Sequence, residues 1–360
     1  MARIVVGMSG GVDSSVAAAL LAEEGHEVIG ITLRTAPWAE PEADAARFGS
    51  CCSPGAAMDA RAVARRLGIR YYLLNHEREF GAAVITDFVR EYRAGRTPSP
   101  CVVCNREVKF GTLLRRALAW EAGGVATGHY ARVLRDPATG RFLLYRGRDE
   151  AKDQSYFLWP LSQAQLARAH FPVGDLTKAA VRAKAQALGL VTAAAPESQE
   201  LCFVAGDYRE FLRARAPEAF EPGPMLDQAG RQVGVHGGLG AYTIGQRRGL
   251  GAAGGTPRYV VRLDPARNAV VVGDDTALMA GGLTATDVNL IAVERLVAPR
   301  EVEVRIRHNA PRVPAVVAPS GPDAVEVRFA RPQRAVTPGQ SVVLYDGDLV
   351  IGGGRITRAA

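Results

Sequence analysis

The chain has 360 residues, of which 48% are hydrophobic and 22% are charged, so it is long enough for two or three domains. This composition argues against disorder, and the apolar runs fall short of the roughly 18–20 residues that a membrane helix requires. The 44 basic and 37 acidic residues give a net charge of +7, which is compatible with a polyanionic partner without demanding one. Only four of the basic residues are lysines, and the other forty are arginines.

The five cysteines are too few and too unevenly spaced for a disulfide scaffold. The first residues lack the extended apolar segment of a signal peptide, so we expect a protein of the reducing cytoplasm. Cysteines in that compartment more often perform chemistry, bind metal or lie in a core than cross-link the fold.

The first two hundred residues alternate β-branched runs with helical stretches, which is typical of a parallel sheet flanked by helices. We expect strands at 3–6, 26–33, 70–75 and 125–127. We expect helices at 14–24, 58–67, 80–92, 113–121 and 177–188. A polar, proline-bearing stretch at 94–100 interrupts this alternation, and turn residues at 136–140 indicate a hairpin between 131–134 and 142–145.

The second half of the chain has a different pattern. From about residue 220 it is rich in Gly and Pro, and from 288 short alternating strands predict a small β-barrel or sandwich, at 301–307, 315–317, 324–329, 341–345 and 349–356. Arg305 and Arg307 alternate along the first of these strands and should share one face. We therefore predict an α/β parallel-sheet domain at 1–205, a small central domain at 206–280 and a β-barrel domain at 281–360.

A glycine-rich loop, GMSGGVDS at 7–14, lies between the first predicted strand and the first predicted helix. Glycines let a backbone approach a ligand closely, and exposed N–H groups at a helix N-terminus attract phosphate oxygens. The loop lacks the lysine of a Walker A motif and does not match GxGxxG. Asp13 in such an anion site is most simply explained by Mg²⁺ that bridges carboxylate and phosphate. The alternative is an ordinary glycine-rich turn.

Three cysteines are candidates for chemistry. Cys101 and Cys104 form a CxxC pair that suits half a zinc site, a redox pair or chance, and the sequence offers no second ligand pair for zinc. Cys202 follows a proline and three polar residues, which indicates an accessible loop. As a nucleophile it would need its thiolate favoured by a helix terminus or a nearby cation. Inert thiols are the alternative.

The string SGGVDS resembles the PP-loop of ATP pyrophosphatases, which split ATP between the α and β phosphates and activate an oxygen as an adenylate. Taken with the separated cysteines, several longer strings resemble the bacterial tRNA-specific 2-thiouridylases over nearly the whole length: CCSPGAAMDA at 51–60, AGRTPSPCVVCNREVKFG at 94–111, KDQSYFL at 152–158, PESQELCF at 196–203 and YTIGQRRGLG at 242–251. The resemblance implies an adenine nucleotide alpha-hydrolase-like PP-loop catalytic domain. It also implies a tRNA-uridine 2-sulfurtransferase that converts the wobble uridine, U34, to 2-thiouridine.

The resemblance also implies roles for individual residues. Cys104 matches the nucleophile that releases sulfur, Cys202 matches the position that bears a persulfide, and Asp13 belongs to the catalytic loop. ATP would be held by Gly7, Met8, Ser9, Gly10, Gly11, Val12, Asp13, Ser14, Leu33 and Gly128. Contacts with tRNA are implied for Ser99, Pro100, Cys101, His129, Lys152, Asp153, Gln154, Arg307, His308 and Gln340.

The implied cofactors are ATP and Mg²⁺, with the metal near Asp13 and no metal site built by the protein alone. The implied partners are tRNA and a persulfide-carrying sulfur donor, without a membrane. We expect a cytoplasmic enzyme; the sequence does not determine its oligomeric state, for which we expect a monomer. Two further readings stay open, an adenylating ligase that uses a nitrogen source and a tRNA-binding module without catalysis.

The sequence departs from one common form of the family, which has Asn-Pro-Asp where this chain has Ser99-Pro100-Cys101. Either the Cys101 thiol replaces the carboxylate, or another group supplies the acid–base function. A further alternative is a [4Fe–4S] cluster held by Cys101, Cys104 and Cys202, as in some related thiolation enzymes. We predict no role for Cys51 and Cys52.

Overall fold

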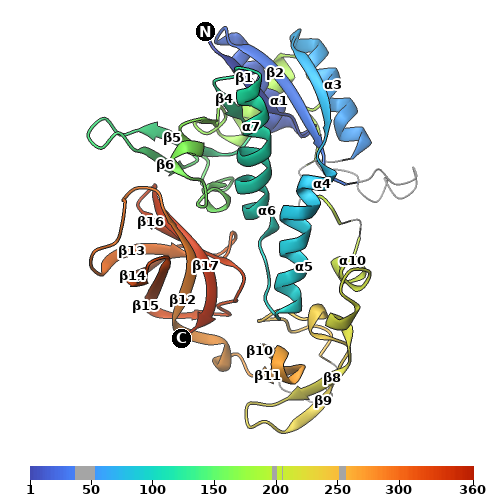
Figure 1. Ribbon diagram of the computed structural model, residues 1–360, viewed down its shortest axis with the longest axis vertical. Coiled ribbons are helices and arrows are strands. Elements are labelled where there is room, and N and C mark those ends of the chain that lie inside the picture. Colours follow the sequence, from blue (N-terminus) through green and yellow to red (C-terminus); the bar gives the residue numbers. More distant parts are fainter. Residues whose placement is uncertain (37–52, 197–200, 205, 251–256) are drawn as a thin grey trace. The chain divides into compact units, whose positions relative to one another are not determined.

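The computed structural model describes residues 1–36, 53–196, 201–204, 206–250 and 257–360. Its residues form two units, which are described one at a time (Figure 1). The first unit comprises Met1–Ile85, Pro100–Gly206 and Asp348–Ile351, and the second comprises Thr86–Ser99, Asp207–Gly347 and Gly352–Ala360. Cys51 and Cys52 lie outside the described residues.

A five-stranded parallel sheet forms the centre of the first unit. Its strand order is β3 (Arg70–Asn75), β2 (Glu27–Arg34), β1 (Arg3–Gly7), β4 (Gly124–Ala126) and β7 (Ala169–His170). The chain adds strands on one side of β1 and then on the other, so the order reverses at β1. Ligands of open α/β sheets bind beyond the carboxyl ends of the strands at such a reversal.

Three helices cover this sheet: α1 (Val12–Glu23), α3 (Pro54–Leu67) and α9 (Lys178–Ala187). Ser53 and Thr177 accept hydrogen bonds from the first-turn amides of α3 and α9, and Gly68 ends α3 in a left-handed conformation. The helices bury small and β-branched side chains, among them Val16, Ala60 and Val181, against Ile4 and Val6 of β1. The predicted parallel sheet with flanking helices is therefore confirmed.

Two π-helical segments make the helices of this region differ from the prediction. The helix expected at 80–92 is divided into α4 (Glu77–Phe80), η1 (Gly81–Ile85) and α5 (Thr86–Arg93). The helix expected from 113 begins at Pro100 and runs through α6 (Pro100–Val103), η2 (Cys104–Thr112) and α7 (Leu113–Ala119). The i, i+5 hydrogen bonding of a π-helix shifts the 3.6-residue repeat on which the expectation relied.

The wide turn of η2 is caused by a side chain from a later helix. Gln165 inserts from α8 (Gln163–Leu166), and its amide nitrogen donates hydrogen bonds to the carbonyl oxygens of Arg106, at 2.9 Å, and Phe110, at 2.8 Å. Gly111 fits beneath the turn, since a Cβ there would lie 2.9 Å from the Arg106 carbonyl oxygen. An inserted side chain of this kind expands a helical turn.

The rest of the first unit forms a hairpin, as predicted, from β5 (Ala131–Arg135) and β6 (Phe142–Arg146). The β6 residues Leu144 and Tyr145 also pair with Val350 and Leu349. A short 3-10 turn, η3 (Ser155–Phe157), follows the hairpin.

In the second unit, α5, α10 (Tyr208–Arg213) and the turns η4 (Pro217–Phe220) and η5 (Leu239–Ala241) accompany a four-stranded sheet. Its order is β10 (Tyr259–Asp264), β11 (Ala269–Gly273), β8 (Gly223–Leu226) and β9 (Gln232–His236). The short turns η6 (Pro265–Arg267) and η7 (Thr276–Leu278) flank β11. Glycine and proline residues interrupt the alternating pattern of these strands in the sequence. The strands nevertheless bury a core that includes Met225, Val260 and Val270.

A closed antiparallel barrel completes the second unit, which decides between the barrel and the sandwich that the sequence left open. Its strand order is β12 (Met279–Leu290), β15 (Ala324–Arg334), β14 (Val313–Gly321), β13 (Arg300–Arg305), β16 (Ser341–Asp346) and β17 (Leu349–Ala359), and β12 pairs with β17 to close it. β13 ends at Arg305, so Arg307 lies beyond the strand and the expectation that both share a strand face is wrong.

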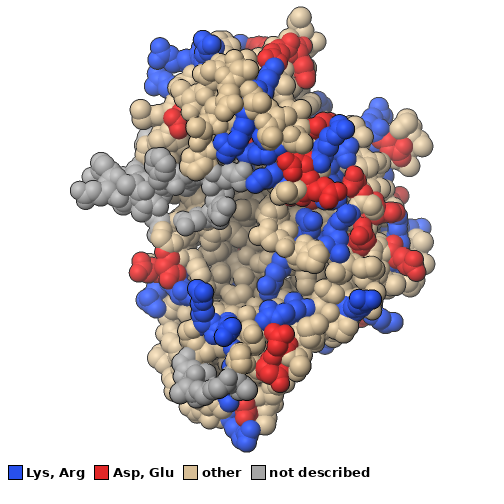
Figure 2. Space-filling model, turned by 180° about the vertical axis from the view of Figure 1, so that it is seen from behind, with Lys and Arg blue, Asp and Glu red and all other residues tan. Residues whose placement is uncertain are grey.

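No described helix is both long and apolar enough to cross a membrane. On the face shown in Figure 2, basic and acidic side chains lie interspersed, in keeping with a charge excess that is spread along the sequence.

Candidate active site

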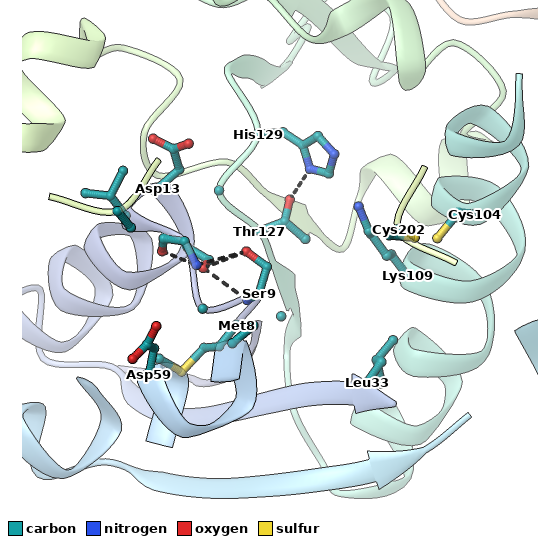
Figure 3. A pocket seen from close by; sticks show the side chains of 18 of the residues that line it. Met8, Ser9, Asp13, Leu33, Asp59, Cys104, Lys109, Thr127, His129 and Cys202 are labelled. Carbon is teal, nitrogen blue, oxygen red and sulfur yellow. Dashed lines mark hydrogen bonds between the residues drawn. The ribbon is translucent and has the colours of Figure 1, made fainter. Parts of the chain in front are cut away.

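A cavity of about 460 Å³ lies in the first unit, where the chain leaves β1 and β4 (Figure 3). The loop that follows β1, residues 7–14, lines it together with the segment 127–130 that follows β4. A volume of several hundred Å³ is typical of sites for small molecules and cofactors. The cavity lies at the reversal point of the sheet, where the topology predicts a ligand.

The glycine-rich loop is held by its own serines. The Ser9 amide donates to Ser14 Oγ at 3.1 Å, and Ser14 Oγ in turn donates to the Gly11 carbonyl oxygen at 3.1 Å. Gly10 has a φ of +75° and packs so tightly that a Cβ would lie 2.4 Å from the Ala56 carbonyl oxygen. The loop is therefore a preformed turn that no other residue type can adopt without strain.

Gly128 permits a second close approach. A Cβ at this position would lie 2.5 Å from the Ser14 amide nitrogen and 2.6 Å from the Asp13 carbonyl carbon. The segment after β4 thus passes directly against the first turn of α1, and both line the cavity. The side chain of Leu33, at the end of β2, also faces the cavity (Figure 3).

Asp13 has two partners that the sequence analysis did not identify. Lys178 Nζ lies 2.7 Å from both carboxylate oxygens, and the Tyr130 hydroxyl donates to Oδ1 at 2.7 Å. Lys178 is the first residue of α9 and lines the same cavity. A signal was present in the sequence, because lysine is rare in this chain, but no motif pointed to this one.

His129 is a buried histidine at the cavity wall. Its Nδ1 lies 2.6 Å from Thr127 Oγ1, and its ring points into the region between the loop and the cysteines (Figure 3). Burial first, and then the positive charge of Lys109, hold the pKa of His129 well below its ordinary value of 6.5. His129 is therefore a neutral hydrogen-bonding group at neutral pH.

Two of the three candidate cysteines meet in this cavity. Cys104, the first residue of η2, and Cys202 both line it, and their sulfur atoms point toward one another in Figure 3. Lys109 lies one helical turn beyond Cys104 and lines the same wall. Cys101 is exposed and is not among the lining residues.

The KDQ string divides into two kinds of residue. Lys152 and Gln154 line the cavity, and Gln154 Oε1 accepts a hydrogen bond from the Tyr130 amide at 3.1 Å. Asp153 is buried, and its carboxylate accepts hydrogen bonds from the Ser155 amide at 3.0 Å and from Arg146 Nε at 3.3 Å. Asp153 thus holds the turn that presents its two neighbours.

Four other predicted residues, Ser99, Arg307, His308 and Gln340, belong to the second unit. Gln340 Nε2 donates to the carbonyl oxygens of Thr97, at 3.0 Å, and Pro98, at 3.2 Å, in the segment that leads to Ser99. Arg307 donates to the Ala335 carbonyl oxygen at 2.7 Å and to Thr337 Oγ1 at 2.6 Å, while Ser99 and His308 are half-buried.

The described residues do not build a metal centre. They contain no group of three or more His, Cys, Asp or Glu side chains placed to hold a metal ion. Cys101, Cys104 and Cys202 are all described, so the ligand set expected for an iron–sulfur cluster is not assembled here. The carboxylate that the sequence offered to Mg²⁺ is engaged by Lys178 and Tyr130.

Three domain families match consecutive parts of the chain. They are the tRNA methyl transferase HUP domain at 2–206, the tRNA methyl transferase PRC-barrel domain at 209–274 and the aminomethyltransferase beta-barrel domain at 280–356. Together they account for nearly every residue.

Full-length relatives are more specific. The chain is 52% identical to proteins named tRNA-specific 2-thiouridylase from Symbiobacterium thermophilum and Roseiflexus castenholzii, with 99% of this chain matched in both cases and 92% and 100% of the relatives, respectively. A protein of the same name from Moorella thermoacetica is 51% identical, with 99% of each chain covered. The domain descriptions name a methyl transferase, whereas the relatives are named as thiouridylases. The relatives determine the family assignment, because each of them matches 99% of this chain. The chain belongs to the tRNA-specific 2-thiouridylase family.

Proposed function

We propose that this protein uses ATP to convert the wobble uridine of tRNA to 2-thiouridine, acting as a tRNA-uridine 2-sulfurtransferase. The observation that carries the proposal is the meeting of two cysteines, Cys104 and Cys202, in the cavity that the glycine-rich loop also lines. One cavity thus combines a phosphate cradle with a pair of sulfur groups. Family membership supports the same activity.

The glycine-rich loop would hold the phosphates of ATP through its backbone N–H groups and the N-terminus of α1. Leu33 and Gly128 would line the adenosine side of the cavity, and the lack of a Cβ at Gly128 lets its backbone pass directly against the first turn of α1. The uracil O2 oxygen attacks the α-phosphate, pyrophosphate leaves, and the oxygen becomes part of an adenylate. This activation makes C2 of the base susceptible to a nucleophile.

Sulfur would then arrive as a persulfide on Cys202, loaded by a persulfide-carrying donor protein. The terminal sulfur attacks C2, and AMP leaves with the former O2 oxygen. The Cys104 thiolate attacks the Cys202 sulfur, which forms a Cys104–Cys202 disulfide and leaves the transferred sulfur on C2. A thiol reductant must supply two electrons to restore both cysteines before the next cycle.

Recognition of tRNA would involve residues of both units. Lys152, Gln154 and His129 line the cavity and would contact the nucleotide that enters it, and Lys152 supplies positive charge. Ser99, Pro100 and Cys101 would meet the target base, and Cys101 stands where family members of one form carry an acidic residue. Asp153 and Gln340 would act indirectly, because each forms hydrogen bonds with backbone groups next to the contacting residues and so fixes their position. Arg307 and His308 would contribute on the second unit.

The proposed reaction needs no metal site built by the protein. Any Mg²⁺ that accompanies ATP would be held by the phosphates, because Lys178 and Tyr130 engage Asp13. The cluster alternative has no support from the described residues, which do not assemble its ligands. The proposed sulfur chemistry therefore depends on the two cavity cysteines. We expect the enzyme to act on its tRNA in the cytoplasm, where thiols are kept reduced.

The test is mass spectrometry of nucleosides from tRNA incubated with enzyme, ATP and a persulfide donor. We expect 2-thiouridine from the wild type and none from Cys202→Ala, Cys104→Ala or Asp13→Ala. Lys184→Arg, which changes a residue paired with Glu23 outside the set that lines the cavity, is the control and should retain sulfur transfer. Normal thiolation by Cys202→Ala would refute the assignment of the cysteines, and a methylated nucleoside in place of a thiolated one would refute the activity.

Iron analysis of anaerobically purified protein separates the cluster alternative. We expect an iron-free protein that is active with the persulfide donor. Activity that requires bound iron would overturn the persulfide route.

A further inference from the structure

The cations of the cavity are unusual for this chain. Arginine outnumbers lysine by forty to four in the sequence, yet three of the four lysines, Lys109, Lys152 and Lys178, are among the described residues that line the cavity. No arginine is among those described lining residues. The fourth lysine, Lys184, lies elsewhere, paired with Glu23 at 2.7 Å. The basic side chains that line the cavity are therefore ammonium groups, in a chain whose other basic side chains are almost all guanidinium groups.

The difference between the two groups is chemical. An ammonium is a compact point charge on a flexible stem, whereas a guanidinium is a planar fork that fixes one geometry. A site that accepts an anion and later releases it gains from a cation that can turn between partners. A site that only needs a rigid structural pair gains from the fork.

Lys178 is the lysine whose position is best defined. Its Nζ lies 2.7 Å from each oxygen of Asp13, its side chain is 12% exposed, and it lies 5.8 Å from the centre of the Tyr130 ring. The Asp13 side chain is 30% exposed and stands in the first turn of α1, beside the amides of the glycine-rich loop. The ion pair thus lies at the wall of the phosphate cradle and is largely sheltered from water.

Charge explains why this pair is needed. A lone carboxylate at the start of α1 would be stabilised by the helix dipole. It would repel any phosphate bound at the same loop, and its limited exposure to solvent strengthens that repulsion. Lys178 cancels the negative charge at hydrogen-bond distance. With the pair formed, the amides of the loop can attract a polyanion.

We propose that Lys178 binds the pyrophosphate part of ATP and that Asp13 is its positioning residue. This inference rests on the proposed function, in which pyrophosphate is the leaving group. Asp13 acts through the lysine that it holds, and Lys178 occupies the place beside this carboxylate that the sequence predicts for Mg²⁺.

The test uses inorganic pyrophosphate as the probe and isothermal titration calorimetry of the full chain in a buffer with EDTA. We expect the wild type to bind, and Lys178→Met to bind about 10- to 100-fold more weakly, as for the loss of one charge-assisted hydrogen bond. Lys184→Arg is the matched control and should bind as the wild type does. Equal affinities of Lys178→Met and the wild type, or a wild type that fails to bind without metal, would overturn the proposal.

Lys178→Arg keeps the positive charge and therefore tests whether weak binding by Lys178→Met results from the lost charge or from a change in folding. It should bind pyrophosphate more tightly than Lys178→Met, at an unchanged melting temperature. If the arginine variant were folded and as weak as the methionine variant, charge at this position would not be the determinant and the proposal would fail.

A second arm separates a positioning carboxylate from a metal ligand. In EDTA, the double variant Asp13→Asn with Lys178→Met should bind pyrophosphate more tightly than Lys178→Met alone, because the uncovered carboxylate no longer repels the probe. A double variant that binds pyrophosphate no more tightly than Lys178→Met would contradict this role. So would an Asp13→Asn variant that binds pyrophosphate more weakly than the wild type only when Mg²⁺ is present. No tRNA or sulfur donor enters the assay, so its result is independent of the thiolation test.

Discussion

Two carboxylate–cation arrangements, one in each unit, show opposite solutions to the same electrostatic problem. In the first unit, Asp13 is paired with Lys178 at a cavity wall. In the second unit, Glu91 is 1% exposed and receives two hydrogen bonds from the fork of Arg96, at 2.7 and 2.8 Å. The chain thus has a flexible lysine at the cavity, where a ligand is expected, and a rigid arginine at a buried ion pair that only stabilises the fold.

The Glu91 arrangement extends to the barrel strand β17. Arg355 Nη1 lies 3.1 Å from Glu91 Oε1 and 3.1 Å from Asp87 Oδ1. Burial alone would raise the pKa of Glu91, but the hydrogen bond from Arg96 and the charges of Arg355, Arg96 and Arg90 outweigh it and hold the pKa below the ordinary value of 4.5. This network fastens α5 to the C-terminal strand.

The largest effect should follow from breaking this network. Glu91→Gln removes the buried carboxylate that Arg96 pairs with and leaves Arg355 with Asp87 alone, so it should lower the free energy of unfolding by about 3–5 kcal/mol at pH 7. Urea denaturation followed by circular dichroism measures it. Because the pKa of Glu91 is lowered on folding, its contribution is present above pH 4.5 and is lost as the pH falls through the folded value, so the two proteins should converge in acid.

A matched control for this change is Glu218→Gln in the same unit. Glu218 pairs with Arg93, but both side chains are about half exposed, so the loss should stay within about 1 kcal/mol. A loss of similar size in both variants would show that burial does not distinguish the two pairs.

The next largest effect tests the cavity. Gly128→Ala places a Cβ 2.5 Å from the Ser14 amide nitrogen, so the segment after β4 must move away from the glycine-rich loop. We expect the rate of thiolation to fall on the order of 100-fold, as for a displacement of catalytic groups by about 1 Å. Gly81→Ala is the control, since nothing lies within 4 Å of its Cβ and its φ of −58° is helical. A Gly128→Ala enzyme with wild-type rate would show that the close approach is dispensable.

The sequence predicted that the glycine-rich loop joins a strand to a helix and singled out both cysteines that line the cavity, because each lies in a distinctive string of residues. It did not predict Lys178 or the burial of Asp153. These depend on contacts between residues far apart in the chain, such as the 2.7 Å approach of Lys178 to Asp13, which no local pattern encodes. The π-helical turn at Cys104–Thr112 was missed for the same reason, since its cause is Gln165 on a later helix. Strand β12 was not predicted, because Gly281 and Gly282 interrupt its alternation.

A smaller effect compares the two cations directly. Arg96→Lys exchanges a two-point contact with Glu91 for a single point charge and should cost about 1–2 kcal/mol of stability. The reverse exchange, Lys184→Arg, affects a half-exposed pair with Glu23 and should change stability by less than about 0.5 kcal/mol. Equal costs for both, measured by urea denaturation, would remove the distinction between structural forks and adaptable point charges.

The last comparison is a pH dependence that belongs to the cavity. Since burial and Lys109 lower the pKa of His129 in the folded protein, the unfolded chain takes up a proton below about pH 6.5 that the folded chain does not. His129 therefore makes stability fall as the pH drops below 6.5, by up to about 1.4 kcal/mol per pH unit. His129→Gln should flatten this acid slope, and Lys109→Met should flatten it partly because it removes the charge that adds to burial. Urea denaturation between pH 7 and pH 5 measures both variants. An unchanged slope in His129→Gln would mean that His129 is protonated in the folded cavity, and the neutral hydrogen-bonding role assigned to it beside Thr127 would be wrong.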